Sequence, residues 1–406
     1  MRILWHGDAA VHTGFGRVTQ EFGERLISRG HEIHALAINW RGDPEVETRI
    51  KLYMPNYFDR NDIYGFNRLG PLIQKIQPDV FVLYNDLPIA QAILENLWRL
   101  PACPPVFLYF PVDAVNLPDF WLIPIRRSTV SATFTRWARN ELIQRDPTLP
   151  EIAVIPHGVD FNAFYPIGPN RPGKVMLSDG SSLDVQSRQE ARAIMGVADR
   201  FVVLWSDRNS PRKNIPQFFE AMAPLIQEHK DILLWVHCKP QDEGGFIEYW
   251  IDRHGLQRNV RITHGLDTWI GVPEYHLNAI YNISDVRVST ALGEGFGLHG
   301  PEAAATRLAQ VAPSFTCFPE VLGDGALYVD PAYPYATQRG VDLAFPSVGQ
   351  ITDAVRTLYN DEVQRRRLGN AGYRHVQQFD WEKLTDSFEG CLKQTAETPF
   401  SPLVTV

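Results

Sequence analysis

The chain has 406 residues, which exceeds the ~250–300 residues at which a single hydrophobic core stops growing, so we expect two domains. Hydrophobic residues make up 44% of the sequence, an ordinary share for a globular protein, and this excludes a largely disordered chain. The formal net charge of -8 argues against broad binding to nucleic acids or anionic membranes, although it leaves room for a local basic cleft.

The sequence shows no signal for targeting or for membrane insertion. No apolar run reaches the ~18 residues that a transmembrane helix needs, and the strand expected at Arg2–Trp5 leaves no room for a signal peptide. The four cysteines lie far apart and lack metal-ligand spacing: Cys103, Cys238, Cys317 and Cys391. We therefore expect free thiols and a cytoplasmic protein with no stable membrane span, at most peripheral to a membrane.

Strands and helices are expected to alternate along the first half of the chain. Helices are expected at Arg17–Ser28 and Ile89–Trp98. The β-rich runs are Arg2–Trp5, Glu32–Ile38, Asp79–Tyr84, Pro105–Phe110, Val130–Phe134 and Ile152–Ile155. This alternation predicts a parallel sheet that is covered on both faces.

A second α/β series follows a stretch rich in Pro, Gly and Ser, from Pro166 to Asp184, which we expect to be an interdomain linker or an exposed loop. Strands are expected at Phe201–Trp205, Ile232–Cys238, Val260–Thr263, Asp285–Ser289, Ala309–Ala312 and Ala326–Val329. Helices are expected at Pro216–Glu228, Pro273–Tyr281, from Pro301 onward, and at Thr352–Tyr359, Val363–Gln377 and Trp381–Gln394. Ligands of open parallel sheets bind beyond the carboxyl ends of the strands, so two such sheets predict one shared cleft.

The strongest chemical signal is the segment from Glu294 to Glu302, which contains three glycines and follows an expected strand. Pro301 suits the first position of a helix and would place Glu302 in the first turn. The glycines let the backbone approach a ligand closely, and amides at a helix start favour an anion. The two carboxylates beside this anion site would bind hydroxyl groups. A sugar nucleotide offers both, a diphosphate for the amides and sugar hydroxyls for the carboxylates, so the combination indicates such a ligand. The alternative is a Gly-rich loop without a ligand.

The Glu-x7-Glu spacing of this segment resembles the signature of GT4-type retaining glycosyltransferases, and the resemblance covers nearly the whole chain. It implies that Glu294 faces the donor sugar and that Glu302 binds the ribose. The donor-binding loop between them would be Gly295, Phe296, Gly297 and Leu298. Relatives usually carry apolar residues or Pro at positions 299 and 300, so His299 either shapes sugar selectivity or is a bystander.

A basic segment follows the strand expected at Phe201–Trp205 and contains Arg208, Arg212 and Lys213. Cations at a strand end suit a diphosphate, which Arg holds bidentately and Lys as a point charge. The segment is similar to the family's Arg-x4-Lys element, which implies that Arg208 and Lys213 bind the donor phosphates. They would also stabilise the leaving nucleoside diphosphate without a metal, and the sequence has no Asp-x-Asp. The alternative is a solvated basic turn.

Two glycines in the first strand–helix connection are weaker candidates. Gly14 and Gly16 form a Gly-x-Gly that lacks the third glycine of a dinucleotide fingerprint. The resemblance implies a loop whose backbone approaches the donor phosphate or the acceptor. A tight turn for helix packing explains the two glycines equally well.

Further candidates follow other strands of the two series. The resemblance implies that Asp113 lines the reaction centre, where it would hydrogen-bond the sugar or orient the acceptor hydroxyl; the alternative is a loop cap. Asn85 and Asp86 together are a weaker candidate at the same sheet edge. Gly265 and Leu266 fall where the family's backbone recognises the nucleobase. Recognition of a base through the backbone requires no particular side chains, so the sequence does not name the base. The donor is therefore expected to be a UDP- or GDP-sugar.

The resemblance implies a GT-B fold, an α/β architecture of two Rossmann-like domains whose parallel sheets face a central cleft. The expected parts are an acceptor-side domain over residues 1–165, a donor domain over 166–380 and a helix over 381–406 that crosses back to the first domain. The implied reaction is retaining transfer of a hexose from a nucleoside-diphosphate sugar to a hydroxyl acceptor. No cofactor and no metal would be required.

The acceptor is left open by the sequence. A glycan or a lipid-linked acceptor is the family default. A group of phage and bacterial GT4-like enzymes offers hydroxymethylated bases of DNA as an alternative. Basic and aromatic residues of the first half would then bind the nucleic acid, unless they are solvated helix faces: Arg17, Arg126, Arg127, Arg136, Arg139, Trp121 and Trp137. An epimerase or phosphorylase-like enzyme and an inactive sugar-nucleotide-binding module are the remaining alternatives.

Overall fold

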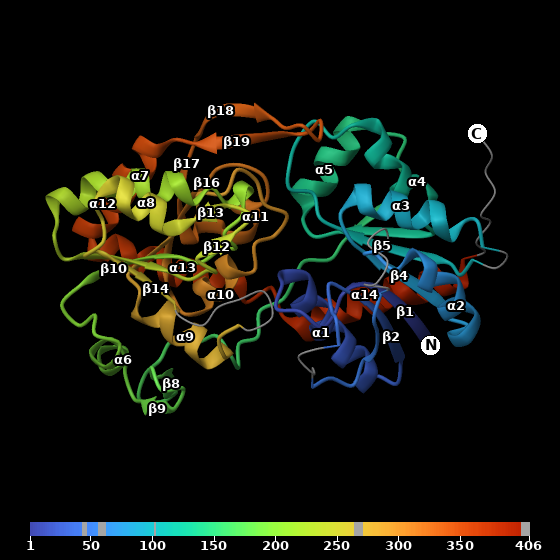
Figure 1. The fold of residues 1–406 in the computed structure, drawn as a ribbon, viewed down its shortest axis with the longest axis horizontal. Coiled ribbons are helices and arrows are strands. Elements are labelled where there is room, and N and C mark those ends of the chain that lie inside the picture. The colour runs from blue at the N-terminus through green and yellow to red at the C-terminus, as the bar shows by residue number, and fades with distance from the viewer. Residues whose placement is uncertain (43–46, 56–61, 101–102, 264–270, 399–406) are drawn as a thin grey trace. The chain divides into compact units, whose positions relative to one another are not determined.

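The computed structural model describes residues 1–42, 47–55, 62–100, 103–263 and 271–398 (Figure 1). The chain divides into two compact units. Unit 1 consists of Met1–Gly158, Gln338–Val341 and Phe379–Val406, and unit 2 consists of Val159–Thr337 and Asp342–Gln378.

Unit 1 is built on a seven-stranded sheet with the order β3-β2-β1-β4-β5-β6-β7, in which all neighbours are parallel. The strands are β1 (Arg2–Asp8), β2 (Glu32–Ile38), β3 (Lys51–Tyr53), β4 (Val80–Tyr84), β5 (Val106–Phe110), β6 (Val130–Thr133) and β7 (Ile152–Val154). The central strands β4 and β5 are apolar throughout and completely buried, as expected when helices cover both faces of a parallel sheet.

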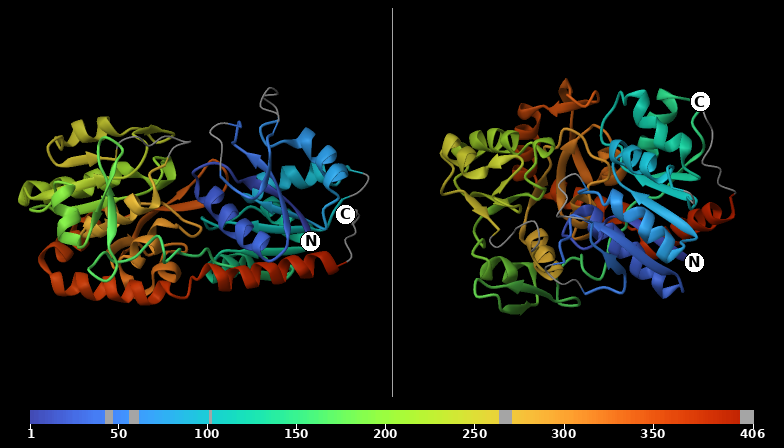
Figure 2. Two further views of the ribbon diagram at one scale, coloured as in Figure 1. Left: turned by 90° about the horizontal axis from the view of Figure 1, so that it is seen from below. Right: turned by 45° about the vertical axis from the view of Figure 1, so that its right-hand side comes forward.

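The helices of unit 1 come from both ends of the chain. They are α1 (Gly14–Ser28), α2 (Phe66–Ile76), α3 (Leu87–Leu97), α4 (Ile123–Arg127), α5 (Arg136–Arg145) and α14 (Trp381–Glu397), with a 3₁₀ turn η1 (Asp119–Leu122). Figure 2 shows α14 lying along the sheet of unit 1. Phe388 of α14 stacks on Phe22 of α1, with ring centroids 4.3 Å apart, and Asp380 caps the helix by accepting from the Lys383 amide.

Unit 2 contains a six-stranded parallel sheet with the order β14-β11-β10-β15-β16-β17. Its strands are β10 (Phe201–Trp205), β11 (Ile232–Val236), β14 (Val260–Ile262), β15 (Val286–Val288), β16 (Ala309–Pro313) and β17 (Ala326–Val329). Its helices are α6 (Arg188–Ile194), α7 (Ile215–Glu228), α8 (Ile247–His254), α9 (Glu274–Ile283), α10 (His299–Ala305), α11 (Phe318–Leu322), α12 (Val348–Asn360) and α13 (Glu362–Val376), with 3₁₀ turns η2 (Pro211–Lys213) and η3 (Gly323–Gly325). Two parallel α/β sheets in one chain confirm the predicted fold class.

In the described residues of unit 2, three antiparallel hairpins lie outside this sheet. The stretch expected as a linker or an exposed loop forms a hairpin of β8 (Gly173–Met176) and β9 (Ser182–Val185), which corrects that expectation. Asp179 makes the turn possible because its carboxylate accepts the Ser181 amide at 2.9 Å. The others pair β12 (Gln241–Asp242) with β13 (Gly245–Phe246) and β18 (Pro331–Ala336) with β19 (Asp342–Pro346).

Candidate functional site

The loops that follow β10 and β15 meet at the carboxyl edge of the unit 2 sheet. The two strands are parallel neighbours, with Val203 opposite Val286 and Leu204 opposite Arg287. Residues 206–213 follow β10, and the loop with Glu294 follows β15. The sheet therefore brings the two strongest sequence motifs together.

Lys213 connects the two loops through its ammonium group. Its Nζ donates to Asp207 Oδ1 at 2.7 Å and to the Glu294 carboxylate. Arg212 adds a second cation, with its Nη1 3.4 Å from Glu294 Oε1. Among these residues Lys213 and Glu294 were expected in the site, and the structure places them in direct contact.

Asp207 is held in place by an arginine that lies within the sheet. Arg287, in the middle of β15, is only 2% exposed. It donates from Nη2 to Asp207 Oδ2 at 3.2 Å and from Nε to Ser206 Oγ at 3.0 Å. Neither Asp207 nor Arg287 was predicted as a site residue from the sequence. The available signal was an arginine between two valines in the strand expected at Asp285–Ser289, because a charge on a buried strand needs a buried partner.

The network shifts the pKa values of its members toward their charged forms. Burial raises the pKa of Glu294, but Lys213 and Arg212 outweigh burial and lower it to about 2. The pKa of Asp207 is also lowered, because Lys213 and Arg287 outweigh its burial. Burial lowers the pKa of Lys213, yet Asp207 and Glu294 raise it overall. The three groups are therefore ionised at neutral pH.

The Gly-rich loop has a conformation that depends on glycine at one position. Gly297 has φ of 74°, and a Cβ there would lie 2.9 Å from Glu294 Cγ. Glu294 is fixed by its own amide, which donates to Thr316 Oγ1 at 3.0 Å. The helix that follows begins at His299 instead of Pro301, because Gly300 joins the helix as well. Glu302 still lies in its first turn.

Glu302 sits in a buried polar group on α9 and α10. It is 2% exposed, and its Oε2 accepts from the Tyr281 hydroxyl at 3.1 Å. The same hydroxyl lies 2.9 Å from His299 Nδ1, and that nitrogen is 3.5 Å from Glu302 Oε2. His299 is therefore a direct neighbour of Glu302. Tyr281 was missed in the sequence, where it is one of many aromatic residues on helices.

Arg208 lies in the same loop as Lys213 but is directed toward the β12–β13 hairpin. Its side chain is 55% exposed and pairs with Asp242 at 2.9 Å and with Glu243 at 3.0 Å. The hydrogen bond from Asp242 raises the pKa of the guanidinium. Gly265 and Leu266 lie outside the residues that the structure describes.

The glycines predicted near the start of the chain lie at the beginning of α1. Thr13 caps the helix by accepting from the Gly16 amide at 3.0 Å and donates to Asp8 Oδ2 at 2.6 Å. A Cβ at Gly16 would lie 2.1 Å from the Val11 carbonyl oxygen, so the packing of this turn requires glycine. Gly14 is exposed.

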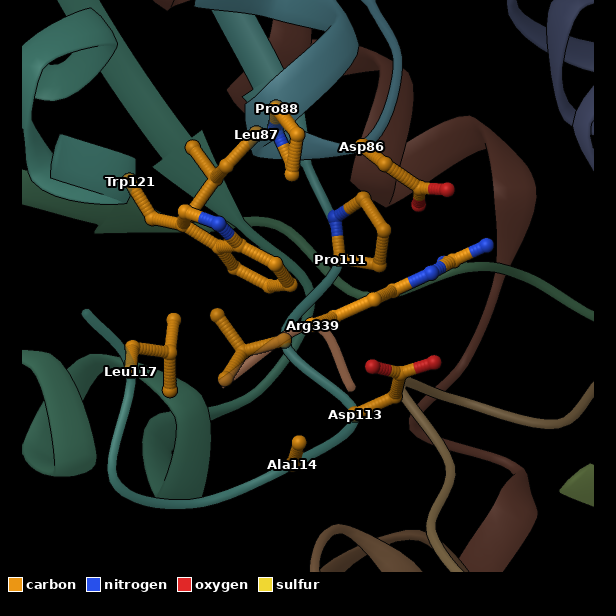
Figure 3. Close-up of a pocket in the computed structure, with 10 residues that line it drawn as sticks. Asp86, Leu87, Pro88, Pro111, Asp113, Ala114, Leu117, Trp121 and Arg339 are labelled. Carbon is orange, nitrogen blue, oxygen red and sulfur yellow. The ribbon is translucent and has the colours of Figure 1, made fainter. Parts of the chain in front are cut away.

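Asp113 follows β5 and lines a pocket of unit 1 (Figure 3). One part of the lining is apolar and includes Trp121, and the other carries the charged side chains of Asp86, Asp113 and Arg339. The full lining is Asp86, Leu87, Pro88, Pro111, Val112, Asp113, Ala114, Leu117, Trp121 and Arg339. All of these residues belong to unit 1.

Two of the basic residues that suggested a nucleic-acid surface, Arg126 and Arg127, have partners within unit 1. Arg126 pairs with Asp146 and donates to Thr148 Oγ1 at 3.2 Å. The Arg127 guanidinium lies 3.4 Å from the centre of the Trp98 ring. Trp121, one of the two expected stacking residues, lines the pocket that contains two carboxylates.

Within the described ranges, no group of three or more His, Cys, Asp or Glu residues is placed to hold a metal ion. The helices in the part of the chain that the structure describes are too short or too polar to cross a membrane.

Comparison with known proteins identifies the region that contains this site. Residues 187–375 match the family described as glycosyl transferases group 1. Over 254 residues the chain is 22% identical to the D-inositol 3-phosphate glycosyltransferase of Corynebacterium diphtheriae, covering 62% of this chain and 52% of the relative. It is 25% identical over 255 residues to the alpha-maltose-1-phosphate synthase of Mycobacterium tuberculosis H37Rv, covering 61% and 58%. The chain thus spans little more than half of these relatives.

Solved structures resemble the chain over almost its whole length. Sucrose-phosphate synthase from Thermosynechococcus elongatus matches with a TM-score of 0.74 at 16% identity, over 97% of this chain and 98% of that one. HepE of Anabaena, solved in complex with UDP and glucose, matches with a TM-score of 0.69 at 17% identity, over 97% and 99%. These likenesses confirm the predicted GT-B fold.

Proposed function

Because this chain carries a glycosyl transferases group 1 domain at residues 187–375 and has the GT-B fold, we propose that it is a retaining glycosyltransferase. It transfers a hexose from a nucleoside-diphosphate sugar to a hydroxyl acceptor. One of the relatives named above is described as a glycosyltransferase, which supports this class of activity.

The observation that carries the proposal is the contact between Lys213 and Glu294 at the carboxyl edge of the unit 2 sheet. The ammonium neutralises Glu294 when no donor is bound. A donor diphosphate would attract Lys213, while Asp207 retains its own bond to the ammonium at 2.7 Å. Glu294 would then be available to accept hydroxyl groups of the donor sugar.

Two further groups complete the proposed donor site. Glu302 binds the ribose hydroxyls, and Arg208 contributes a second cation for the diphosphate. Arg208 is 55% exposed and its ion pairs are at the surface, where such pairs contribute only about 0–1 kcal/mol, so it can exchange Asp242 and Glu243 for phosphate.

In the proposed reaction the bond between the anomeric carbon and the β-phosphate oxygen breaks. The acceptor oxygen bonds to the same carbon on the same face, and its proton passes to the departing phosphate oxygen. Lys213 and Arg208 stabilise the charge that develops on the leaving diphosphate, and the amides of Gly295–Leu298 add hydrogen bonds. No cofactor or metal takes part in this scheme.

The donor to test first is UDP-glucose. HepE of Anabaena is also solved with UDP-glucose, with a TM-score of 0.69 at 15% identity. GDP-hexoses are the next candidates, because the residues expected to contact the base lie outside the described ranges.

For the acceptor, we favour a glycan or a lipid-linked glycan. A DNA acceptor would need an exposed basic surface on unit 1, whereas Arg126 and Arg127 are engaged with Asp146 and Trp98. Modified DNA is the second candidate.

The proposal is tested by following nucleotide release from UDP-glucose and the configuration of the product. The expected result is slow release of UDP by donor hydrolysis, with the α-anomer of glucose formed first in ¹H NMR. Glu302→Ala should abolish release. Formation of the β-anomer would contradict retention, and full donor binding without any release would favour an inactive binding module.

A further inference from the structure

The β12–β13 hairpin presents two carboxylates to a guanidinium of the proposed donor site. Arg208 donates from Nε to Asp242 Oδ2 at 2.9 Å and from Nη2 to Asp242 Oδ1 at 3.4 Å. The same Nη2 donates to Glu243 Oε1 at 3.0 Å. Asp242 thus takes both arms of the guanidinium fork, which is the geometry in which an arginine holds two oxygens of a phosphate.

The hairpin is fixed to the residue that follows Arg208. Asn209 is 1% exposed, and its Nδ2 donates to the carbonyl oxygens of Pro240 at 3.2 Å and Gly245 at 2.8 Å. The Gly244 amide donates back to the Asn209 carbonyl oxygen at 3.0 Å. A Cβ at Gly244 would lie 2.2 Å from Asn209 Oδ1, so this contact requires glycine. The hairpin backbone therefore keeps its two carboxylates beside Arg208.

The ion pairs of Arg208 can nevertheless be exchanged for other anions. The side chains of Arg208 and Glu243 are 55% and 63% exposed, and pairs in contact with water contribute little to stability. Burial raises the pKa of Asp242, but hydrogen bonds from Arg208 and from the Glu243 amide outweigh burial and lower it overall. Lys239 lowers this pKa further and lines the same open hollow as Asp242. A displaced Asp242 carboxylate therefore has a second cation nearby.

The arrangement makes the hairpin a competitor of the donor. A diphosphate carries more negative charge than a carboxylate and can displace it from Arg208, but part of its attraction is then spent on breaking the existing pairs. We propose that Asp242 and Glu243 are a built-in substitute for the donor diphosphate, which holds Arg208 in the ligand-free protein and lowers the affinity for donor and product. This rests on the proposed function, which assigns Arg208 to the donor phosphates.

The competition acts mainly on release. Because the hairpin backbone is fixed to Asn209, the two carboxylates stay beside Arg208 while a diphosphate is bound. They can pair with the guanidinium again as soon as the phosphate moves away. Changes of affinity at one binding site appear mainly in the dissociation rate, so the hairpin should speed the departure of the nucleoside diphosphate after transfer.

The experiment measures binding of inorganic pyrophosphate and of UDP-glucose to the full chain by isothermal titration calorimetry. Pyrophosphate is used because it requires no contact to a base or a sugar. Asp242→Asn and Glu243→Gln should each tighten pyrophosphate binding about three- to fivefold, and the double variant about tenfold. UDP-glucose affinity should rise in the same order, and stopped-flow displacement should show the gain as slower dissociation.

Glu248→Gln is the matched control, because Glu248 is an exposed carboxylate in the first turn of α8, directly after the hairpin. It should bind pyrophosphate like the wild type. In an Arg208→Met background, Asp242→Asn should bring no further gain, because the competing pair no longer exists. This double-mutant cycle separates competition for Arg208 from a general decrease in negative charge.

The outcomes distinguish the hairpin from the donor site. An equal gain in Glu248→Gln, a gain that persists without Arg208, or pyrophosphate binding that is absent or unchanged in the Asp242 and Glu243 variants would overturn the proposal. Pyrophosphate binding with the expected order, together with no UDP-glucose binding by the wild type, would refute the nucleoside-diphosphate sugar as the ligand and still support exchange at Arg208.

Discussion

Lys213 is the central residue of the proposed donor site. Its ammonium holds two buried carboxylates in the ligand-free protein, on Asp207 and Glu294. Buried ion pairs of this kind contribute little net stability, because desolvation offsets their attraction. In this site the two ion pairs hold the Lys213 ammonium in place at the sheet edge. The donor diphosphate, a further anion, can then bind to a positive charge that is already positioned.

Replacing Lys213 should therefore remove donor affinity. We expect Lys213→Met to weaken UDP-glucose binding about 100-fold, or ~2.7 kcal/mol, as measured by isothermal titration calorimetry. The exposed Lys230→Met serves as the control for loss of one positive charge. Circular dichroism must show a folded variant, since two carboxylates lose a partner; an unchanged dissociation constant would refute the role of Lys213.

Arg287 is expected to act on donor binding through Asp207. Arg287→Met should weaken UDP-glucose binding about tenfold, because Asp207 then loses the partner that holds it beside Lys213. Arg287→Lys should restore part of the lost affinity. The matched control is Arg192→Met, a similarly buried arginine that pairs with Asp285 elsewhere in unit 2. Both methionine variants should lower the melting temperature. If donor affinity falls equally in both, Arg287 is merely structural.

At the scale of single elements, the pattern of apolar residues predicted the strands well but the segments between them poorly. Phe201–Trp205 and Glu32–Ile38 form strands with the predicted bounds. Phe201–Trp205 is an uninterrupted apolar run, which fits a strand buried in a parallel sheet. The β8–β9 hairpin was missed because Lys174, Ser182 and Asp184 give it a polar sequence. In that hairpin the backbone pairing is held by a turn and by neighbouring helices, which composition does not reveal.

The Gly-rich loop before α10 offers a test at this scale. Gly297→Ala should destabilise the protein by about 1–3 kcal/mol and weaken donor binding, because the new Cβ would collide with Glu294. Gly180→Ala is the control: Gly180 has φ of 84°, but its Cβ would meet nothing within 4 Å. It should cost about 1 kcal/mol from backbone strain alone and leave donor affinity unchanged. Equal donor affinity in both variants would contradict the expected displacement of Glu294.

At the scale of the whole molecule, the repeated alternation of strands and helices was enough to predict two parallel sheets, and the family resemblance of the Glu294–Glu302 segment supplied the GT-B fold. The motifs led to a single sheet edge in unit 2, since Lys213 and Glu294 follow adjacent strands and contact each other. The Asp207–Arg287 pair and Tyr281 could not be found in the same way. Their roles depend on which side chains face each other after folding, and no local spacing encodes that.

The charge network also predicts how the stability of the protein depends on pH. The folded-state pKa of Glu294 is about 2, below its ordinary value of 4.5, so its contribution is present above pH 4.5 and is lost as the pH falls toward 2. The loss should amount to at most ~3 kcal/mol. Urea unfolding measures the unfolding free energy of the wild type and of Glu294→Gln. As the pH falls from above 4.5 toward 2, the wild type should lose up to this amount relative to the variant. A difference that is independent of pH would contradict the ionised contact.

The central claim is that unit 2 binds a nucleoside-diphosphate sugar, and a thermal-shift screen with UDP-, GDP-, ADP- and dTDP-sugars tests it most directly. A ligand at 100 times its dissociation constant adds ~2.7 kcal/mol to the folded state, which is readily visible as a higher melting temperature. We predict that one nucleotide class raises the melting temperature of the wild type and that Glu302→Ala abolishes the effect. No shift with any donor, or an equal shift in Glu302→Ala, would contradict the proposed donor site.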